Sequence, residues 1–529
     1  MSGICAHCLI FHPNRCSYGP FFHHLPGYSA LNPFEMETEK SMALLQVMGN
    51  EGLVPSMEEE IKRRNIIDKL RKIVMEWAKR VAYQRRLPNC YIRAASATVV
   101  IYGSCGLGVH NHDSDIDALC VGPSFATMAD DFFVVLKNML ASQPEVSNIL
   151  CVKDSRVPLM RLSFDGIMTD LTYAKLNVIN VPENVDLVNP FFSSNIDEIS
   201  LRSLSGVCAN KRILKLVPNL EVYQPLLRCV KFWAKRRGIY GNVLGYFGGI
   251  HLAVLAAFVC LKQPSASLSV LVSSFLRTFA FWPWPTPVIL ENDAMPLQTN
   301  NFFLKKILMP IQLPCSPNRY CYSYFTRSTF NRIRQEFLHG YELLTKDIFR
   351  QDFDWKFLFE PFPYVKKYSH FLKICLSSLN QDKLGDWVGL VKSRIRNLVI
   401  KLEEVQGFCD PNPIEYVDTE LAEPHVIFFW GLCPGKSNLI SVDSIKEEFT
   451  RNVYAGHEGP FGKIDLRVVK ASEFPKTNID TGKRGSTRPC WRVLDEHERN
   501  VALYSKHVPG YFVGYLSVNE YAGYPGVAL

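Results

Sequence analysis

The sequence lacks any long uninterrupted hydrophobic run. Its nearest approach, residues 241–261 (GNVLGYFGGIHLAVLAAFVCL), contains glycines and a histidine and is typical of a buried helix, whereas a membrane span takes about 20 apolar residues. The first residues, MSGICAHCLIFHPNRC, also lack the charged start, apolar run and cleavage site of a secretory signal. We therefore expect a globular chain that does not span a membrane, with its 16 scattered cysteines present as reduced thiols.

Acidic residues are outnumbered by basic ones, and the formal charge of the 529 residues is +8. This balance favours polyanionic partners without identifying one. Basic residues lie beside aromatic ones in residues 231–237 (KFWAKRR), and Lys392, Arg394 and Arg396 form a second basic cluster. Such mixtures suit binding of a nucleic-acid backbone combined with base stacking, although each cluster also fits a solvated helix face. We expect the second cluster to line an RNA path.

The length exceeds what one hydrophobic core supports and predicts about two to four domains. Residues 1–50 are rich in His, Pro, Asn and Gly and are expected to be irregular. Ser56 and Glu59 then form a capping box ahead of apolar residues at helical spacing, which predicts an amphipathic helix. Residues 51–175 are interpreted as a mixed α/β domain, with strands and a helix expected at 97–102, 116–121, 132–140, 158–164 and 170–174.

A second domain, residues 176–364, is predicted to be mostly helical. Its helices are expected at residues 230–236, 244–261, 267–279 and 327–344. A third α/β domain is expected over residues 365–475, with helices and a strand at 364–376, 384–402 and 425–432. Residues 476–529 show no periodicity, so the sequence leaves their order undecided.

One short segment, GSCGLGVHNHDSDIDALCV, carries the most specific pattern. Gly103 and Ser104 end a predicted strand, and after ten residues Asp115 and Asp117 open the next. Residues two apart in a strand face the same side, so both carboxylates are expected to meet at one point, where they require a cation. Their hard oxygens suit Mg²⁺, or Mn²⁺ as a substitute. Asp170, on a later strand of the same domain, completes a two-metal site for in-line attack on phosphorus.

The glycines of this segment are interpreted as a phosphate-binding turn. Without Cβ atoms, the backbone N–H groups can approach a triphosphate, and the Ser104 hydroxyl adds a donor. The glycine order G-x-x-G-x-G differs from a dinucleotide-binding loop, and no helix is expected directly after the strand. Turn capping or surface ion pairs would be the alternative explanation of the aspartates.

Together these residues resemble the signature of the DNA polymerase β-type nucleotidyltransferase superfamily. Five longer segments resemble the eukaryotic poly(A) polymerases, over about residues 45–475: LGVHNHDSDIDALCVGP, VPLMRLSFDGIMTDLTYAKL, VKFWAKRRGIYGNVLGYFGGI, WPWPTPVIL and DWVGLVKSRIRNLV. The resemblance implies a nucleotidyltransferase domain, a helical central domain and an RRM-like C-terminal domain around a cleft. It further implies that AMP is transferred from ATP to an RNA 3′ end.

The same resemblance assigns roles to individual residues. The metal-binding carboxylates would be Asp115, Asp117 and Asp170. Nucleotide contacts would come from Gly103, Ser104, Lys231, Tyr240, Asn242, Gly248, Gly249, Ser205 and Thr326. The sequence departs from the family at Ser205, where an Asn is usual, and at Cys105 and Gly106, where Tyr-Arg is usual. Because Ser has a shorter reach than Asn, we expect a looser choice of base.

Further expectations follow from the resemblance. The long Ser/Thr-rich tail of animal members is absent from this sequence, which resembles the short-tailed plant members. A nuclear location is implied, with a cytoplasmic pool left open because no strong basic nuclear signal is present. Cleavage and polyadenylation factors are expected partners of a monomer. A terminal uridylyltransferase, a CCA-adding enzyme and an RNA-binding relative without turnover are the alternatives, and the three carboxylates argue against the last.

Overall fold

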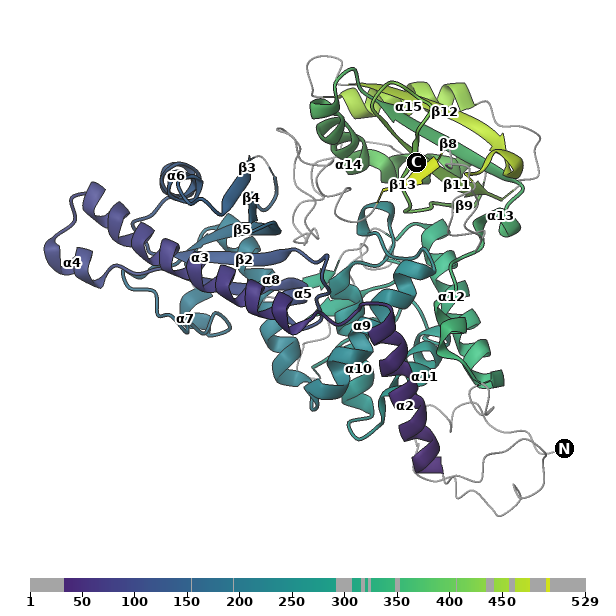
Figure 1. Cartoon of the computed structure of the whole chain (residues 1–529), viewed down its shortest axis with the longest axis horizontal. Helices are drawn as coiled ribbons and strands as arrows, with labels where there is room; N and C mark the ends of the chain where they lie inside the picture. Colours follow the sequence, from purple (N-terminus) through teal and green to yellow (C-terminus); the bar gives the residue numbers. More distant parts are fainter. Residues whose placement is uncertain are drawn as a thin grey trace, which may run out of the picture.

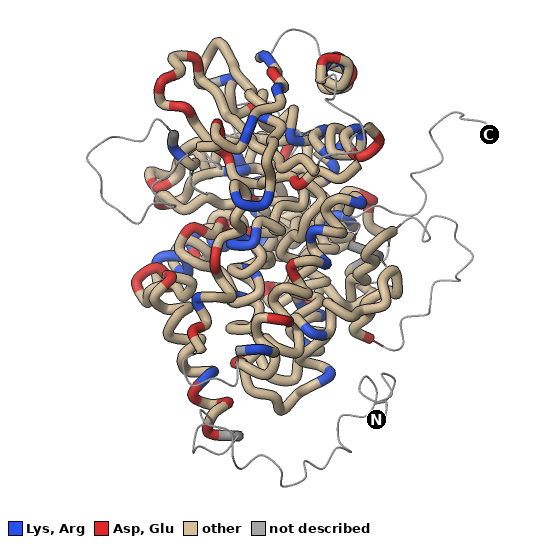
Figure 2. Tube along the Cα trace, turned by 90° about the vertical axis from the view of Figure 1, so that its right-hand side faces the viewer, with Lys and Arg blue, Asp and Glu red and all other residues tan. Residues whose placement is uncertain are grey.

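The computed structural model describes residues 33–153, 155–193, 195–291, 307–314, 319–321, 325–347, 353–405, 407–433, 442–455, 462–475 and 491–494. Figure 1 shows two sheets on opposite sides, one within residues 98–175, here named the catalytic sheet, and one within residues 370–493, here named the C-terminal sheet, with the helices of the central domain between and below them. No helix in the described part of the chain is both long and apolar enough to cross a membrane. On the face seen in Figure 2, Lys and Arg are interspersed with Asp and Glu.

The catalytic sheet has five strands in the order β1-β2-β5-β4-β3. They are β1 (Thr98–Tyr102), β2 (Ile116–Gly122), β3 (Val146–Val152), β4 (Leu159–Phe164) and β5 (Ile167–Lys175). Strands β2 and β5 pair in parallel, whereas the other neighbours are antiparallel. The predicted strands are confirmed, and β3 is an additional edge strand that the sequence pattern did not reveal. The parallel pairing sets Asp117 directly beside Asp170.

Helices cover this sheet on both faces. The helices of this domain are α3 (Met57–Gln84), α4 (Asn89–Ala94), α5 (Gly103–Gly106), the π-helix η1 (Met128–Leu136), α6 (Lys137–Ala141), α7 (Pro190–Ser193) and α8 (Glu198–Leu216), of which α3 and α8 pack on opposite faces of the sheet. The capping box of Ser56 and Glu59 is confirmed at the start of α3. Helix α8 packs against β5 and β1, and its Leu204 and Val207 share a core cluster with Leu119 of β2. This packing favours a domain boundary after α8 rather than at residue 175.

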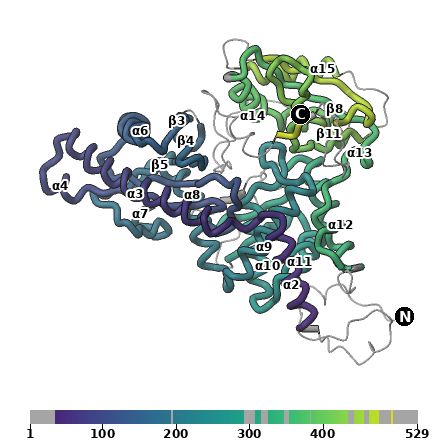
Figure 3. Tube along the Cα trace, viewed as in Figure 1, coloured from purple at the N-terminus to yellow at the C-terminus, as the bar shows by residue number. Residues whose placement is uncertain are grey.

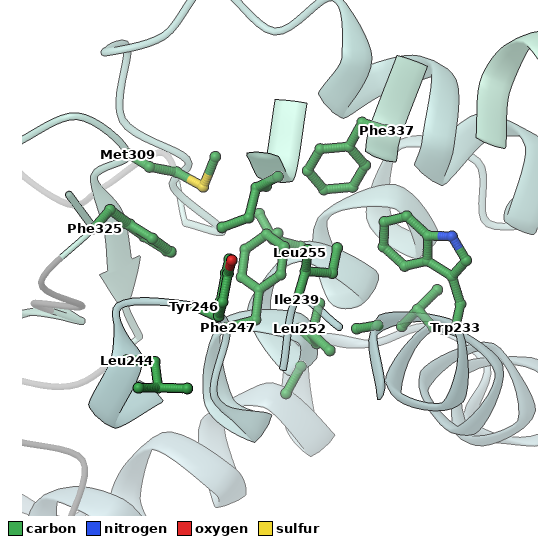
Figure 4. Packing of buried hydrophobic residues seen from close by; sticks show 14 of the residues in the cluster. Trp233, Ile239, Leu244, Tyr246, Phe247, Leu252, Leu255, Met309, Phe325 and Phe337 are labelled. Atoms are coloured by element: carbon green, nitrogen blue, oxygen red, sulfur yellow. The ribbon is translucent and has the colours of Figure 1, made fainter. Parts of the chain in front are cut away.

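The central domain is helical. It contains α2 (Pro33–Asn50), α9 (Leu220–Arg236), the 3-10 turn η2 (Asn242–Leu244), α10 (Gly249–Lys262), α11 (Leu268–Ala280), α12 (Arg327–Asp347) and the 3-10 turn η4 (Trp355–Phe359), with a short hairpin of β6 (Ile311–Leu313) and β7 (Arg319–Cys321). Figure 4 shows Trp233, Phe247 and Phe337 packed in its core, where the rings of Trp233 and Phe337 lie 5.4 Å apart.

Helix α2 corrects the expectation that residues 1–50 are irregular. It lies beside α11, far away in the sequence (Figure 3), and the Ser269 backbone N–H donates to Ser41 Oγ at 3.1 Å. Within the described part of α2, only Leu44 and Met48 are buried apolar residues. Two buried positions give too weak a helical period to be recognised from sequence. Residues 1–32 lie outside the described residues.

The C-terminal domain is built on a sheet in the order β12-β8-β11-β10-β13, with β9 pairing β11. Its elements are α13 (Tyr364–Lys367), β8 (His370–Ser377), α14 (Gln381–Val405), β9 (Cys409–Asp410), β10 (Tyr416–Asp418), β11 (His425–Leu432), α15 (Val442–Tyr454), β12 (Lys463–Lys470), the 3-10 turn η5 (Ala471–Glu473) and β13 (Trp491–Val493). The helix expected at 384–402 and the strand at 425–432 are confirmed by α14 and β11.

The helix predicted over residues 364–376 is wrong, because most of this segment is strand β8. The strand lies between β11 and β12 and packs on both faces. Leu372 and Ile374 belong to one core cluster, whereas Phe371 belongs to another. A strand buried on both faces has a nearly continuous apolar sequence, which lacks the alternation that identifies a half-buried strand.

Candidate active site

Most of the predicted site residues meet in one cavity of about 380 Å³ between the catalytic sheet and helices α8 and α9. Its lining includes Gly103, Ser104, Asp115, Asp117, Asp170, Lys231, Tyr240 and Gly249. The three carboxylates therefore share a cavity with the hydroxyl of Ser104 and the positive charge of Lys231. The fold thus brings together residues that are up to 146 positions apart in the sequence, from Gly103 to Gly249.

The glycine turn is shaped by the carboxylate beside it. Gly103 has φ +64°, and a Cβ atom there would lie 1.8 Å from Asp117 Oδ2. A side chain at this position would be strained and would also collide with the carboxylate. The expectation that no helix follows is wrong, because residues Gly103–Gly106 form the single helical turn α5. Asn210 of α8 fixes this turn by donating from Nδ2 to the Gly103 carbonyl at 3.0 Å.

The loop over residues 107–115 is held from two sides. Arg228 of α9 donates from Nη2 to the Gly108 carbonyl at 2.6 Å. Arg63 of α3, itself buried, donates to the His112 carbonyl at 3.0 Å. Both bonds bring a charged donor to a backbone oxygen, which makes them stronger than neutral hydrogen bonds. Helices of two domains thus position the loop that leads into Asp115.

Negative charge dominates the floor of the cavity. Burial raises the pKa of Asp117 to about 8, with Asp170 and then Asp115 adding to the shift, while Arg161 and Lys231 oppose it. A buried carboxylate surrounded by like charges is stabilised by a cation, and these hard oxygen donors fit Mg²⁺ or Mn²⁺. In the described residues, however, no three His, Cys, Asp or Glu side chains lie close enough to form a ready metal site.

One of the three carboxylates is instead engaged by Arg161 of β4, a residue that the sequence interpretation missed. It is paired directly with Asp170 of β5 in the antiparallel register. Its Nε donates to Asp170 Oδ1 at 2.5 Å and its Nη2 donates to Oδ2, so both carboxylate oxygens are engaged. The side chains of this pair are 9% and 6% exposed, respectively. An arginine inside the apolar stretch VPLMRLSF was the available signal.

Four of the predicted nucleotide-binding residues are not part of the cavity lining: Ser205, Asn242, Gly248 and Thr326. Thr326 is buried and hydrogen-bonds with Thr329, and the Gly248 backbone N–H donates to His251 Nδ1 at 2.8 Å. Asn242 begins the turn η2. In the structure these four residues therefore do not line the cavity.

Helix α8 presents a different set of residues to the cavity, namely Arg202, Ser203, Gly206 and Asn210. Ser203, Gly206 and Asn210 follow helical spacing along one face, whereas Ser205 is rotated by about 200° from Ser203. Ser205 instead donates its hydroxyl to the Arg202 carbonyl at 2.6 Å. The expectation that Ser205 contacts the base therefore lacks support from this geometry.

The basic cluster on α14 divides into two kinds of residue. Lys392 is 12% exposed and its Nζ lies 2.5 Å from Glu415 Oε1, an ion pair that holds α14 onto the sheet, and its place on an RNA path stays a prediction. Arg394 and Arg396 are half-buried on the same helix. Helix α14 also packs against η2, next to Tyr240, so these two arginines are carried by an element that adjoins the cavity.

Comparison with known proteins relates most of the chain to one family. Residues 27–217, 222–361 and 363–419 match models of the poly(A) polymerase nucleotidyltransferase domain, the poly(A) polymerase central domain and the poly(A) polymerase predicted RNA binding domain. Nuclear poly(A) polymerase 3 of Arabidopsis thaliana is 54% identical over 488 residues, which cover 91% of this chain and 95% of the relative.

More distant relatives are longer. Nuclear poly(A) polymerase 4 of Arabidopsis thaliana is 36% identical over 76% of this chain, and the poly(A) polymerase of Dictyostelium discoideum is 36% identical over 79%. The chain spans only 56% and 53% of these two relatives. A solved structure of the Cid1 poly(U) polymerase matches 61% of this chain and 99% of its own at 17% identity, with a TM-score of 0.41 that is too low to bear on activity.

Proposed function

Because the chain belongs to the poly(A) polymerase family, we propose that its cavity binds ATP and an RNA 3′ end against Asp115, Asp117 and Asp170. The activity of the family is adenylation of RNA 3′ ends. In this reaction the 3′-hydroxyl oxygen bonds to the α-phosphorus of ATP, the bond from that phosphorus to the bridging oxygen breaks, and pyrophosphate leaves. The convergence of the three carboxylates in one cavity is the observation that carries the proposal.

The carboxylates are proposed to hold two divalent cations, Mg²⁺ or Mn²⁺. Bound there, the cations would lower the pKa of the attacking hydroxyl and neutralise charge on the leaving group. Asp117 and Asp170 are placed side by side by the parallel pairing of β2 and β5, and Asp115 precedes β2. This chain supplies the ligands from rigid strands, which keeps their spacing fixed.

The cavity also contains groups suited to the triphosphate and the nucleoside. The Ser104 hydroxyl is a hydrogen-bond donor and the ammonium of Lys231 is a compact positive charge, and both suit phosphate oxygens. Tyr240 is proposed to contact the ribose, and Gly249 leaves room for the base beside it. Selection of adenine is assigned to the α8 face with Ser203 and Asn210 instead of to Ser205.

The location and partners are also proposals. Relatives named nuclear poly(A) polymerases support a nuclear location, and processing factors at RNA 3′ ends are the proposed protein partners. We propose that the chain acts as a monomer, because the three domains together provide the carboxylates, the nucleotide contacts and an RNA-facing helix.

The direct test of this function is competition among ATP, GTP, CTP and UTP on an unstructured RNA primer with Mg²⁺. Predominant incorporation of AMP would support the proposal. A tail rich in uridine, or addition limited to CCA, would assign the chain to another nucleotidyltransferase activity. Absence of incorporation of any nucleotide, with either Mg²⁺ or Mn²⁺, would indicate an RNA-binding protein without turnover.

A further inference from the structure

The ion pair between Arg161 and Asp170 occupies a proposed metal ligand. We propose that Arg161 is a resident counter-ion that competes with a divalent cation for Asp170, so that Asp170 must leave the arginine before it can bind metal. This inference rests on the proposed function, since it assumes that the three carboxylates form the metal site. It makes Arg161 a positioning residue that sets how tightly the site binds metal.

The geometry of the pair supports this competition. Arg161 and Asp170 are direct neighbours in the register of β4 and β5, so the backbone holds them together. Two parallel hydrogen bonds join the guanidinium to both oxygens of the carboxylate. Bidentate, charge-assisted contacts of this kind are strong and directional. A cation binding to Asp170 would lie close to the guanidinium, and the two positive charges would repel each other.

The surrounding charges keep the arginine in place. Asp170, Asp115 and Asp117 together raise the pKa of Arg161 against the opposing effect of burial. Arginine in any case keeps its proton at all pH values where proteins remain folded. Deprotonation therefore offers no way to release Asp170, and only rotation of one side chain away from the other does so.

The two proposed metal positions should therefore differ in their affinity for a cation. A cation held by Asp115 and Asp117 leaves the pair of Arg161 and Asp170 intact. A cation that needs Asp170 must separate a nearly buried ion pair, which leaves the guanidinium without its carboxylate unless an anion, such as a phosphate of the substrate, replaces it. We therefore expect metal to bind tightly at the first position and weakly at the second.

The test is a Mn²⁺ titration of the full chain by calorimetry, without nucleotide. Arg161→Met keeps most of the side-chain volume and removes the charge, and we expect it to tighten Mn²⁺ binding at the weaker position about tenfold. Asp170→Asn should remove that position both alone and combined with Arg161→Met. Lys231→Met is the matched control, because it removes a positive charge of the cavity that is not part of the ion pair between Arg161 and Asp170. It should change the Mn²⁺ affinity of the weaker position less than Arg161→Met does.

The titrations distinguish the role of Arg161 from the assignment of Asp170 as a metal ligand. Unchanged or weaker Mn²⁺ binding in Arg161→Met would overturn the inference, since the arginine would then orient Asp170 for metal. Unchanged binding in Asp170→Asn would instead overturn the metal assignment of the proposed function. Arg161→Lys keeps the charge but loses the two parallel hydrogen bonds to Asp170. Its affinity for Mn²⁺ at the weaker position should therefore lie between those of the natural chain and Arg161→Met. If Arg161→Met is too unstable to titrate, a larger rise in Tm with Mn²⁺ for Arg161→Lys than for the natural chain is expected, and an equal or smaller rise would contradict the inference.

Discussion

At the scale of single residues, the carboxylates and the glycine beside them form a tightly packed unit. Asp115, Asp117 and Asp170 were expected together from their spacing within and between strands, and all three line one cavity. Arg161 was not, because its partner is set by the register of two strands and not by any local pattern. Ser205 does not line the cavity, and the sequence motif alone gave no information on the rotation of α8.

Substitution of Gly103 tests how closely the turn and the carboxylate are packed. Gly103→Ala adds a Cβ atom that would lie 1.8 Å from Asp117 Oδ2 and must displace it. We expect kcat to fall by about a hundredfold, the order expected when a reacting group moves by about 1 Å. Gly166→Ala is the matched control, because Gly166 also has a positive φ of +77° but a Cβ atom there meets nothing within 4 Å. Equal losses of activity in the two variants would argue against the contact.

A buried histidine makes folding stability depend on pH. Burial lowers the pKa of His251 to about 4, and its Nδ1 accepts the Gly248 N–H. The unfolded chain binds this proton near pH 6.5 while the folded chain does not, so the stabilisation is complete above pH 6.5 and is lost as the pH falls toward 4. By pH 5 the loss of unfolding free energy is about 2 kcal/mol.

His251→Asn removes the titration and keeps an acceptor for Gly248. Urea unfolding at pH 7.5 and pH 5 measures the change in stability for both proteins. The natural chain should lose about 2 kcal/mol more than the variant between these pH values. Equal losses would mean that His251 is protonated in the folded protein or accessible to solvent.

At the scale of elements, a buried carboxylate joins the central domain to the C-terminal domain. Asp410 of β9 accepts hydrogen bonds from Tyr246 at 2.6 Å, from Tyr368 at 2.7 Å and from Arg332 of α12 at 3.0 Å. Tyr246 belongs to the segment between Tyr240 and Gly249, which both line the cavity. The contact therefore anchors the segment that carries Tyr240 and Gly249 to the C-terminal domain.

Asp410→Ala should destabilise the protein by about 3 to 5 kcal/mol, because it leaves the buried Arg332 without one of its partners. It should also raise KM for ATP, since the segment carrying Tyr246 loses its anchor. Tyr368→Phe is the milder control, which removes one hydrogen bond and should cost about 1 kcal/mol. Urea unfolding and steady-state kinetics measure both effects, and a loss for Asp410→Ala no larger than for Tyr368→Phe would contradict this role.

Helices with a clear apolar periodicity were predictable from the sequence. Elements with few buried positions, or with buried residues on both faces, were not. Helices α3, α11 and α14 follow an apolar stripe that the sequence displays. Helix α2 has few buried positions, and β8 is apolar on both faces, so each lacks the pattern of its own class. The partners that pack against these elements decide their structure.

At the scale of the whole molecule, the C-terminal domain brings basic residues to the neighbourhood of the cavity. The core cluster that contains Trp233 of the central domain continues into Trp387 and Trp430 of the C-terminal domain, so these two domains pack together. The catalytic sheet has its own cluster around Trp77. An RNA bound at Asp117 could therefore extend along α14, which adjoins the turn η2.

Neutralising Arg394 and Arg396 together to Gln tests this path. We expect weaker binding of oligo(A) and a shallower dependence of affinity on salt, by about one unit of slope for each phosphate that the protein no longer neutralises. Lys392→Met is the control, because Lys392 is paired with Glu415 and should affect stability more than the salt slope. Fluorescence anisotropy at several salt concentrations gives the slopes, and an unchanged slope in the double variant would leave these arginines as part of a structural helix face.

The central claim is that Asp115, Asp117 and Asp170 carry out RNA adenylation, and primer extension by Asp117→Asn tests it most directly. The substitution keeps the side-chain shape and replaces the proposed metal-binding carboxylate with an amide, so ATP and RNA should still bind while kcat falls by about a hundred- to thousandfold. Asp165→Asn, in the turn between β4 and β5, is the control and should extend the primer normally, since Asn tolerates its φ of +51°. Extension by Asp117→Asn at the rate of the natural chain would contradict the account.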